Sequence, residues 1–146
     1  MSKRKRQLEL FAVGLKHDRL ITVTNCIQKI NPTVCCMPFT YPEEALTALR
    51  HRSYTQQPGL ILLDDSLINQ FLWKAKGHPL MRQVPVLVIA SQVSEQVLKQ
   101  AYQQGANSVI EVPQSTQAFM EVMNTTLSYW FNYAALTDGD FLGQSR

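Results

Sequence analysis

Cysteine and histidine are scarce in this chain. The 146 residues include three cysteines, Cys26, Cys35 and Cys36, and three histidines. No second cysteine pair or histidine stands at the spacing of zinc ligands. Neighbouring residues of a strand point to opposite faces, so Cys35 and Cys36 are badly placed to share a metal. We therefore expect no metal centre, and small buried cysteines in a reduced compartment.

Long apolar runs are also missing. No run approaches the roughly 20 residues that cross a bilayer, and no apolar signal-peptide core follows the basic start. Apolar residues make up 45% of the chain and charged residues 17%, which is typical of a folded domain. A chain of this length forms one domain with a real core. These features predict a cytoplasmic globular protein with no membrane partner.

A strong charge bias is absent once the start of the chain is set aside. The net charge is +3, and four of the positive charges lie in residues 3–6. Without these four, the chain has 10 basic and 11 acidic residues, which gives a net charge of −1. We expect no nucleic-acid partner, because such binding depends on many phosphate contacts. The predicted organisation is a flexible basic tail at 1–7, one domain at 8–136 and a disordered tail at 137–146.

The stretch Pro58–Asp65 organises the rest of the chain. Its sequence, PGLILLDD, has four branched apolar residues between a Pro-Gly breaker and two carboxylates. This pattern is typical of a strand buried on both faces. Asp64 and Asp65 then fall at its C-terminal end, where open parallel sheets build their sites. They either form such a site or only solvate the end of the strand.

Strand and helix patterns alternate along the chain. A pattern Thr40-x-x-Glu43 with Pro42 predicts a capped second helix. The alternation indicates an α/β fold, a doubly wound five-stranded parallel sheet with helices on both faces. The predicted strands are 8–13, 33–39, 60–64, 84–90 and 107–112, and the predicted helices are 17–30, 40–50, 67–75, 94–104 and a last one from 115.

Four segments together resemble the response-regulator receiver domain of two-component signalling. They are PEEALTAL, LILLD, VPVLVIAS and GANSVIEVP, and the resemblance covers Leu8 to Trp130. It implies a flavodoxin-like receiver fold with strand order 2-1-3-4-5. The connection HRSYTQQPG and the aromatic pair Tyr129 and Trp130 resemble the single-domain subgroup that partners phytochromes and similar histidine kinases.

The family transfers a phosphoryl group to an aspartate. The resemblance implies Asp64 as the phosphoacceptor position, and magnesium held by this residue and an acidic pair after the first strand. A hydroxyl after the fourth strand and a lysine after the fifth would bind the phosphoryl group. The matching positions depart from that pattern. The acidic pair falls on Val13 and Gly14, the hydroxyl on Ala90 or its neighbour Ser91, and the lysine on Val112.

These departures predict a degenerate receiver that acts by protein-protein interaction, with no enzyme activity and no cofactor. The alternative is a phosphorylatable regulator with acceptor Asp64, whose Mg²⁺ would need replacement ligands such as Asp18, Asp65 or Glu111. Asp65 would point away from Asp64 if the strand continued. A small hydrolase or transferase is the alternative from another class. The lack of a Gly-rich phosphate loop, a nucleophile elbow or a histidine near a strand end argues against it.

Aromatic side chains near the end of the chain predict an interaction surface, because interfaces favour aromatic anchors. The resemblance implies contacts through the fourth helix, fifth strand and fifth helix, with the family's switch aromatic falling on Val109. The expected partners are a histidine kinase or other signalling protein, and a second copy in a homodimer. The alternative is that Trp130 and Phe131 complete the core of the last helix. The core role suits Trp130 better, whereas Phe131 and Tyr133 fall off the apolar stripe and are the better interface candidates. The interface candidates are Tyr102, Val109, Tyr129, Trp130, Phe131 and Tyr133.

Overall fold

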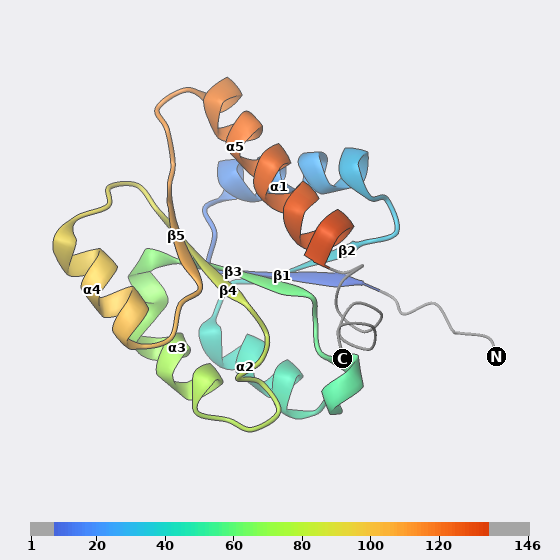
Figure 1. Ribbon diagram of the computed structural model, residues 1–146, viewed down its shortest axis with the longest axis vertical. Coiled ribbons are helices and arrows are strands. Elements are labelled where there is room, and N and C mark those ends of the chain that lie inside the picture. Colours follow the sequence, from blue (N-terminus) through green and yellow to red (C-terminus); the bar gives the residue numbers. More distant parts are fainter. Residues whose placement is uncertain (1–7, 135–146) are drawn as a thin grey trace, which may run out of the picture.

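The computed structural model describes residues 8–134, and side chains for 8–132. Its centre is a five-stranded parallel sheet of order β2-β1-β3-β4-β5 (Figure 1). This confirms the predicted fold class and strand order. The proposed tails at 1–7 and 137–146 lie outside the described residues. The strands are β1 (Glu9–Val13), β2 (Cys35–Phe39), β3 (Leu60–Asp64), β4 (Val86–Ala90) and β5 (Ser108–Glu111).

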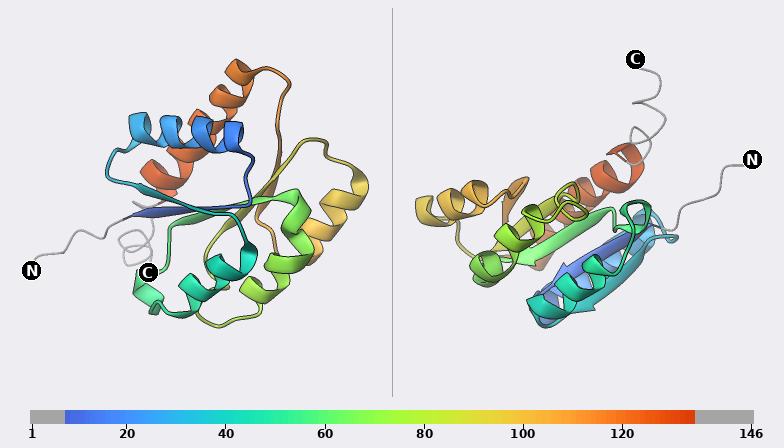
Figure 2. Two further views of the ribbon diagram at one scale, coloured as in Figure 1. Left: turned by 180° about the vertical axis from the view of Figure 1, so that it is seen from behind. Right: turned by 90° about the horizontal axis from the view of Figure 1, so that it is seen from below.

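Helices cover both faces of the sheet. Figure 2 shows α1 and α5 on one face and α2, α3 and α4 on the other. None of the helices within 8–134 is long and apolar enough to span a membrane. The helices are α1 (His17–Ile30), α2 (Pro42–Arg50), α3 (Ile68–Lys76), α4 (Glu95–Gln103) and α5 (Thr116–Ser128), with short helical turns η1 (Tyr54–Gln56), η2 (Asp65–Leu67) and η3 (Tyr129–Ala134).

The two central strands are buried along their whole length. Every residue of β3 and of β4 is buried, as their continuous apolar runs predicted. Side chains of β3 alternate between the two cores, because successive strand residues point to opposite faces. Leu60 and Leu62 face α1 and α5, whereas Ile61 and Leu63 face α2, α3 and α4. Asp64 continues the first series and so ends the strand on the side of α1.

The start of α2 differs from the predicted capping box. The helix begins at Pro42, and the residue that caps it is Tyr41, which makes no side-chain capping bond. Thr40 therefore lies one residue too early to cap. The Glu43 carboxylate turns instead to Lys74 of α3, with Nζ and Oε2 2.8 Å apart, and this pairing lowers the pKa of Glu43. Pro42 in the first turn still favours the helix start.

Phe131 belongs to the core, so its prediction as an exposed interface residue was wrong. It is 3% exposed and packs with the residues beneath α1 and α5. A Cβ added at Gly59 would lie 3.1 Å from the Phe131 ring, so the ring contacts the chain just before β3. The buried residues Phe119, Met123 and Leu127 precede it at steps of four. Phe131 continues this stripe through the wider turn η3.

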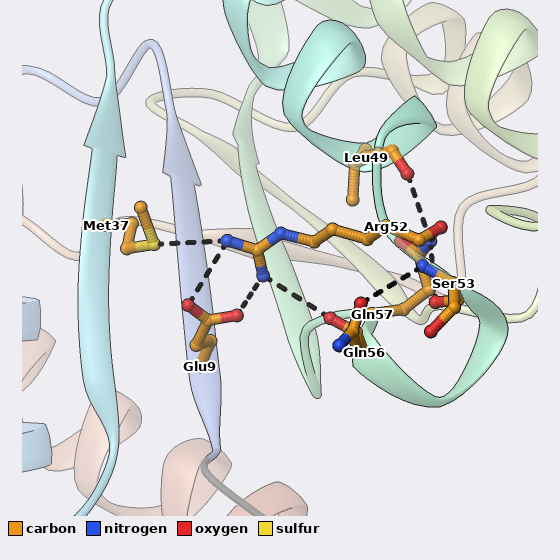
Figure 3. Close-up of polar contacts among 7 residues, drawn as sticks. All are labelled: Glu9, Met37, Leu49, Arg52, Ser53, Gln56 and Gln57. Carbon is orange, nitrogen blue, oxygen red and sulfur yellow. Dashed lines mark hydrogen bonds and ion pairs between the residues drawn. The ribbon is translucent and has the colours of Figure 1, made fainter.

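The amino end of the sheet is held together by Arg52, which lies in the connection between α2 and β3 (Figure 3). Its guanidinium pairs with the Glu9 carboxylate at the start of β1 and lies 5.0 Å from the Phe11 ring centroid. Gln57 Nε2 donates to the carbonyl oxygens of Leu49 and Arg52, each at 3.0 Å. The polar connection is thus fixed to the sheet, at the end opposite Asp64.

Candidate functional site

Asp64 is a buried carboxylate at the carboxyl end of β3. It is 5% exposed. The strand stops there, and the chain enters η2, whose first turn Asp64 caps. Its Oδ2 accepts hydrogen bonds from the Ser66 backbone N–H at 3.1 Å and from the Ser66 hydroxyl at 2.5 Å. These two donors fix the orientation of the carboxylate and leave Oδ1 to face the neighbouring helix.

Arg19 is the cation that Oδ1 of Asp64 faces. It lies in the first turn of α1, and its side chain is 12% exposed. Nη1 lies 3.8 Å from Asp64 Oδ1, and Nη2 donates a 2.6 Å hydrogen bond to the hydroxyl of Ser91. Both Nη1 and Oδ1 are buried without a hydrogen-bond partner. One guanidinium therefore connects the end of β3 to the residue that follows β4.

The residues around Asp64 do not fit a magnesium ion. Val13 is fully buried and Gly14 has no side chain, so the end of β1 offers no carboxylate. Gly14 has a φ of +73°, and a Cβ there would lie 2.4 Å from Leu67 Cδ1. The leucine side chain thus fills the space above Gly14. A divalent ion beside Asp64 would also meet the charge of Arg19. Within 8–134 no three His, Cys, Asp or Glu residues are grouped as metal ligands.

Other acids near the site do not supply the missing ligands. Asp65 begins η2 and is half-buried. Burial, and then the charge of Asp64, raise the pKa of its carboxyl above the ordinary value. Asp18 is exposed and accepts the backbone N–H of Arg19 at 2.9 Å. Glu111 is exposed at the end of β5. The strand ends before Asp65, so it does not point opposite Asp64 as a continued strand would require.

Two further positions lack the groups that the resemblance implies. Ala90 is fully buried and carries no hydroxyl, and the hydroxyl of its neighbour Ser91 accepts the bond from Arg19. Val112 is half-buried, packs against the apolar cluster beneath α1 and α5, and donates its backbone N–H to the carbonyl of Ala90. An apolar side chain thus stands where the resemblance implies a lysine.

Comparison with known proteins rests on structure alone. No protein-family model and no curated protein matches the sequence. A response regulator from Hahella chejuensis matches with a TM-score of 0.76 and 17% identity, over 86% of this chain and 96% of that one. A receiver domain from Rhodospirillum rubrum matches with a TM-score of 0.74 and 20% identity, over 84% and 92%. The chain has the receiver-domain fold.

A phytochrome-linked protein is among the structures with this receiver fold. The phosphorylated cyanobacterial phytochrome response regulator RcpA matches with a TM-score of 0.73 and 16% identity, over 85% of this chain and 94% of that one. At such identities the matches establish the arrangement of strands and helices. The role of Asp64 depends on the residues around it.

The five interface candidates with described side chains fall into three groups on the receiver fold. Tyr102 of α4 is 50% exposed and Tyr129 is 55% exposed. Trp130 is half-buried and meets Tyr129 edge to face, with ring centroids 5.2 Å apart, and Val109 is half-buried against the core beneath α3 and α4. Phe131 is core, and the side chain of Tyr133 lies outside the described residues. Among the described interface candidates, Tyr102 and Tyr129 are the exposed ones.

Sequence reasoning missed Arg19 and Ser66 at the site. It considered acids that could replace metal ligands and did not consider a base. The alternation of strand side chains was a usable signal for Arg19. Asp64 lies on the same face of its strand as Leu60 and Leu62, which is the face covered by α1. Arg19 lies in the first turn of this helix. Ser66, two residues after the carboxylate, matches the common turn in which an aspartate accepts the N–H two residues on.

Proposed function

We propose that the chain is a response-regulator-like protein of a two-component signalling system, located in the cytoplasm. It acts through protein contacts, without the magnesium-dependent phosphorylation of an ordinary receiver and without enzyme activity. The observation that carries this proposal is the Arg19 guanidinium facing Asp64, beside a Val13-Gly14 pair with no carboxylate. The receiver fold supports a histidine kinase or another signalling protein as the partner.

Electrostatics favours this reading of Asp64. Phosphoryl transfer to a carboxylate gathers negative charge, which a metal ion and fixed donors must offset. Removing one such fixed donor typically slows an enzymatic reaction by roughly 100 to 1,000-fold. Arg19 supplies one positive charge here, but its guanidinium also donates a hydrogen bond to Ser91. The metal ligands and the lysine that would add to this charge are missing. We therefore expect phosphorylation of Asp64 to be far slower than in an ordinary receiver.

The exposed aromatic residues indicate where a partner or a second copy binds. Tyr102 and Tyr129 each keep half or more of their surface exposed, on α4 and just after α5. Large aromatic side chains contribute much of the binding energy in protein interfaces. Replacing either tyrosine with alanine should weaken partner binding or homodimer formation while the fold is retained. Sedimentation velocity on the two variants measures the homodimer part of this proposal.

One observation favours the alternative, in which Asp64 is phosphorylated. Oδ1 has no hydrogen-bond partner, so an oxygen lone pair is not engaged. Arg19 is also a group that binds phosphoryl oxygens well. In this alternative Arg19 replaces part of the charge that a metal and a lysine would supply.

Intact-mass spectrometry distinguishes the two functions. The protein is incubated with a small-molecule phosphodonor, with and without magnesium, beside an ordinary receiver as the positive control. Asp64→Asn tests the acceptor, and Asp65→Asn is the matched control at the neighbouring carboxylate. We expect no phosphoryl adduct on the native chain. A magnesium-dependent adduct that Asp64→Asn abolishes and Asp65→Asn retains would establish the phosphorylatable alternative.

A further inference from the structure

Arg19 contacts two parts of the chain at the carboxyl end of the sheet. Its Nη1 faces Asp64 at the end of β3, and its Nη2 donates to Ser91. Ser91 begins the connection between β4 and α4, and α4 starts four residues later at Glu95. The guanidinium thus spans from α1 across β3 to the segment that leads into α4.

We propose that Arg19 is an internal clamp, which holds the β4–α4 connection in one arrangement without metal or phosphate. The clamp deepens the proposed function, because α4 carries the exposed Tyr102 of the interaction surface. The guanidinium suits this task because separate nitrogens reach the two partners: Nη2 donates to Ser91, and Nη1 makes an ion pair with Asp64 at 3.8 Å. A lysine in its place would keep the charge but not the fork.

Burial gives the clamp its strength. The carboxylate of Asp64 and the guanidinium of Arg19 are both largely removed from water, with 6% and 12% of their side-chain surfaces exposed. A charge in such a place is costly when its partner is missing. The bond to Ser91 lies at the surface, yet it joins a charged donor to a hydroxyl at only 2.6 Å. Charged hydrogen bonds of this kind are stronger than neutral ones.

Few other hydrogen bonds fix the described connection, although Val97 at the start of α4 also packs against the core. Its described hydrogen bonds near α4 are the capping bond from the backbone N–H of Val97 to the hydroxyl of Ser94, at 3.1 Å, and the first helical bond from Leu98 to the carbonyl of Ser94, at 3.0 Å. Both lie within the start of α4. Among the hydrogen bonds of the described residues, the one from Arg19 to Ser91 therefore links this start to the Asp64 site.

Backbone-amide NMR on the full chain tests the clamp. The variants are Arg19→Gln, Arg19→Lys and Ser91→Ala, with Arg50→Gln as the matched control at an exposed arginine of α2. We expect Arg19→Gln and Ser91→Ala to lower the amide order parameters of residues 91–98 and to speed exchange of the amides of 97 and 98. Arg19→Lys should do so as well, because it loses the fork. The Arg50→Gln variant and added magnesium should leave these amides unchanged.

A double-mutant cycle supplies the second readout. In urea unfolding, Arg19→Gln and Ser91→Ala should be coupled by at least about twofold in the unfolding equilibrium constant, as expected for groups in contact. The clamp would be refuted if the two substitutions were additive, or if the amide order parameters of residues 91–98 did not change in the Arg19→Gln variant. It would also be refuted if the order parameters of all helices fell equally, or if magnesium raised those of residues 91–98 in the native chain. These outcomes are separate from the mass measurement, so the clamp can fail while the proposed function stands.

Discussion

Replacing Phe131 with alanine tests whether the end of the chain is core or interface. The ring is 3% exposed and lies against Gly59, where an added Cβ would already be 3.1 Å away. The Gly59 backbone N–H donates to the Glu9 carbonyl at 2.9 Å, which limits how far this backbone can move into the space that the ring leaves. Buried Phe→Ala substitutions typically cost about 3–5 kcal/mol. Because Phe131 lies near the end of the described helix, we expect the lower value, about 3 kcal/mol.

Urea unfolding followed by circular dichroism measures this cost, with Tyr129→Ala as the matched control. Tyr129 is 55% exposed and loses mainly its edge-to-face contact with Trp130, which is worth about 0.5–1.5 kcal/mol. Phe131→Ala should therefore be clearly the more destabilising change. Equal costs for the two variants would refute the core assignment. So would a Phe131→Ala variant that unfolds like the native chain but no longer assembles in sedimentation velocity.

Three further predictions use urea unfolding. Arg52→Gln breaks the half-buried ion pair with Glu9 and should lower the free energy of unfolding by about 1–3 kcal/mol. A change below about 0.5 kcal/mol would show that the ion pair does not stabilise the fold. Gly14→Ala should cost at least about 1 kcal/mol, because the φ of +73° disfavours a side chain and because the added Cβ meets Leu67. Adding Leu67→Ala should recover only the share of the cost that comes from the contact with Leu67. Additive costs for the two substitutions would contradict this geometry. Burial and the adjacent carboxylate of Asp64 raise the pKa of Asp65 in the folded protein above 3.8. The free energy of unfolding of the native chain, relative to that of Asp65→Asn, should therefore fall as the pH rises from 3.8 through the raised pKa. A difference between the two proteins that does not change with pH would contradict this.

The fold was predictable because its signals are local and repeated. The short, continuous apolar runs of β3 and β4 between turn signals indicate strands buried on both faces. Five strand patterns that alternate with helical patterns then leave few topologies. Element ends were less predictable. Thr40 and Glu43 have the residue types and spacing of a capping box, but the helix begins at Pro42 with Tyr41 as its cap. Glu43 instead pairs with Lys74, which lies far along the chain. Long-range pairing of this kind leaves no local signal.

The candidate site was predictable where a backbone position determines the residue, and unpredictable where a side chain reaches in from elsewhere. Asp64 follows from the end of a buried strand. The contact of Arg19 with Ser91 joins residues 72 positions apart and depends on how α1 packs on the sheet. Phe131 was misassigned because its spacing of four from Leu127 was not counted as part of the apolar stripe.

The packing of Leu67 over Gly14 limits how this protein could be engineered. A designer who wished to install a magnesium site would need a carboxylate at position 14, where the backbone φ disfavours any side chain and Leu67 occupies the space. Arg19 would also have to be removed from the Asp64 carboxylate. Each change alone creates a strained side chain or an unpaired buried charge before any metal can bind. The route therefore requires concerted substitutions, with every single-step intermediate less stable than the starting chain.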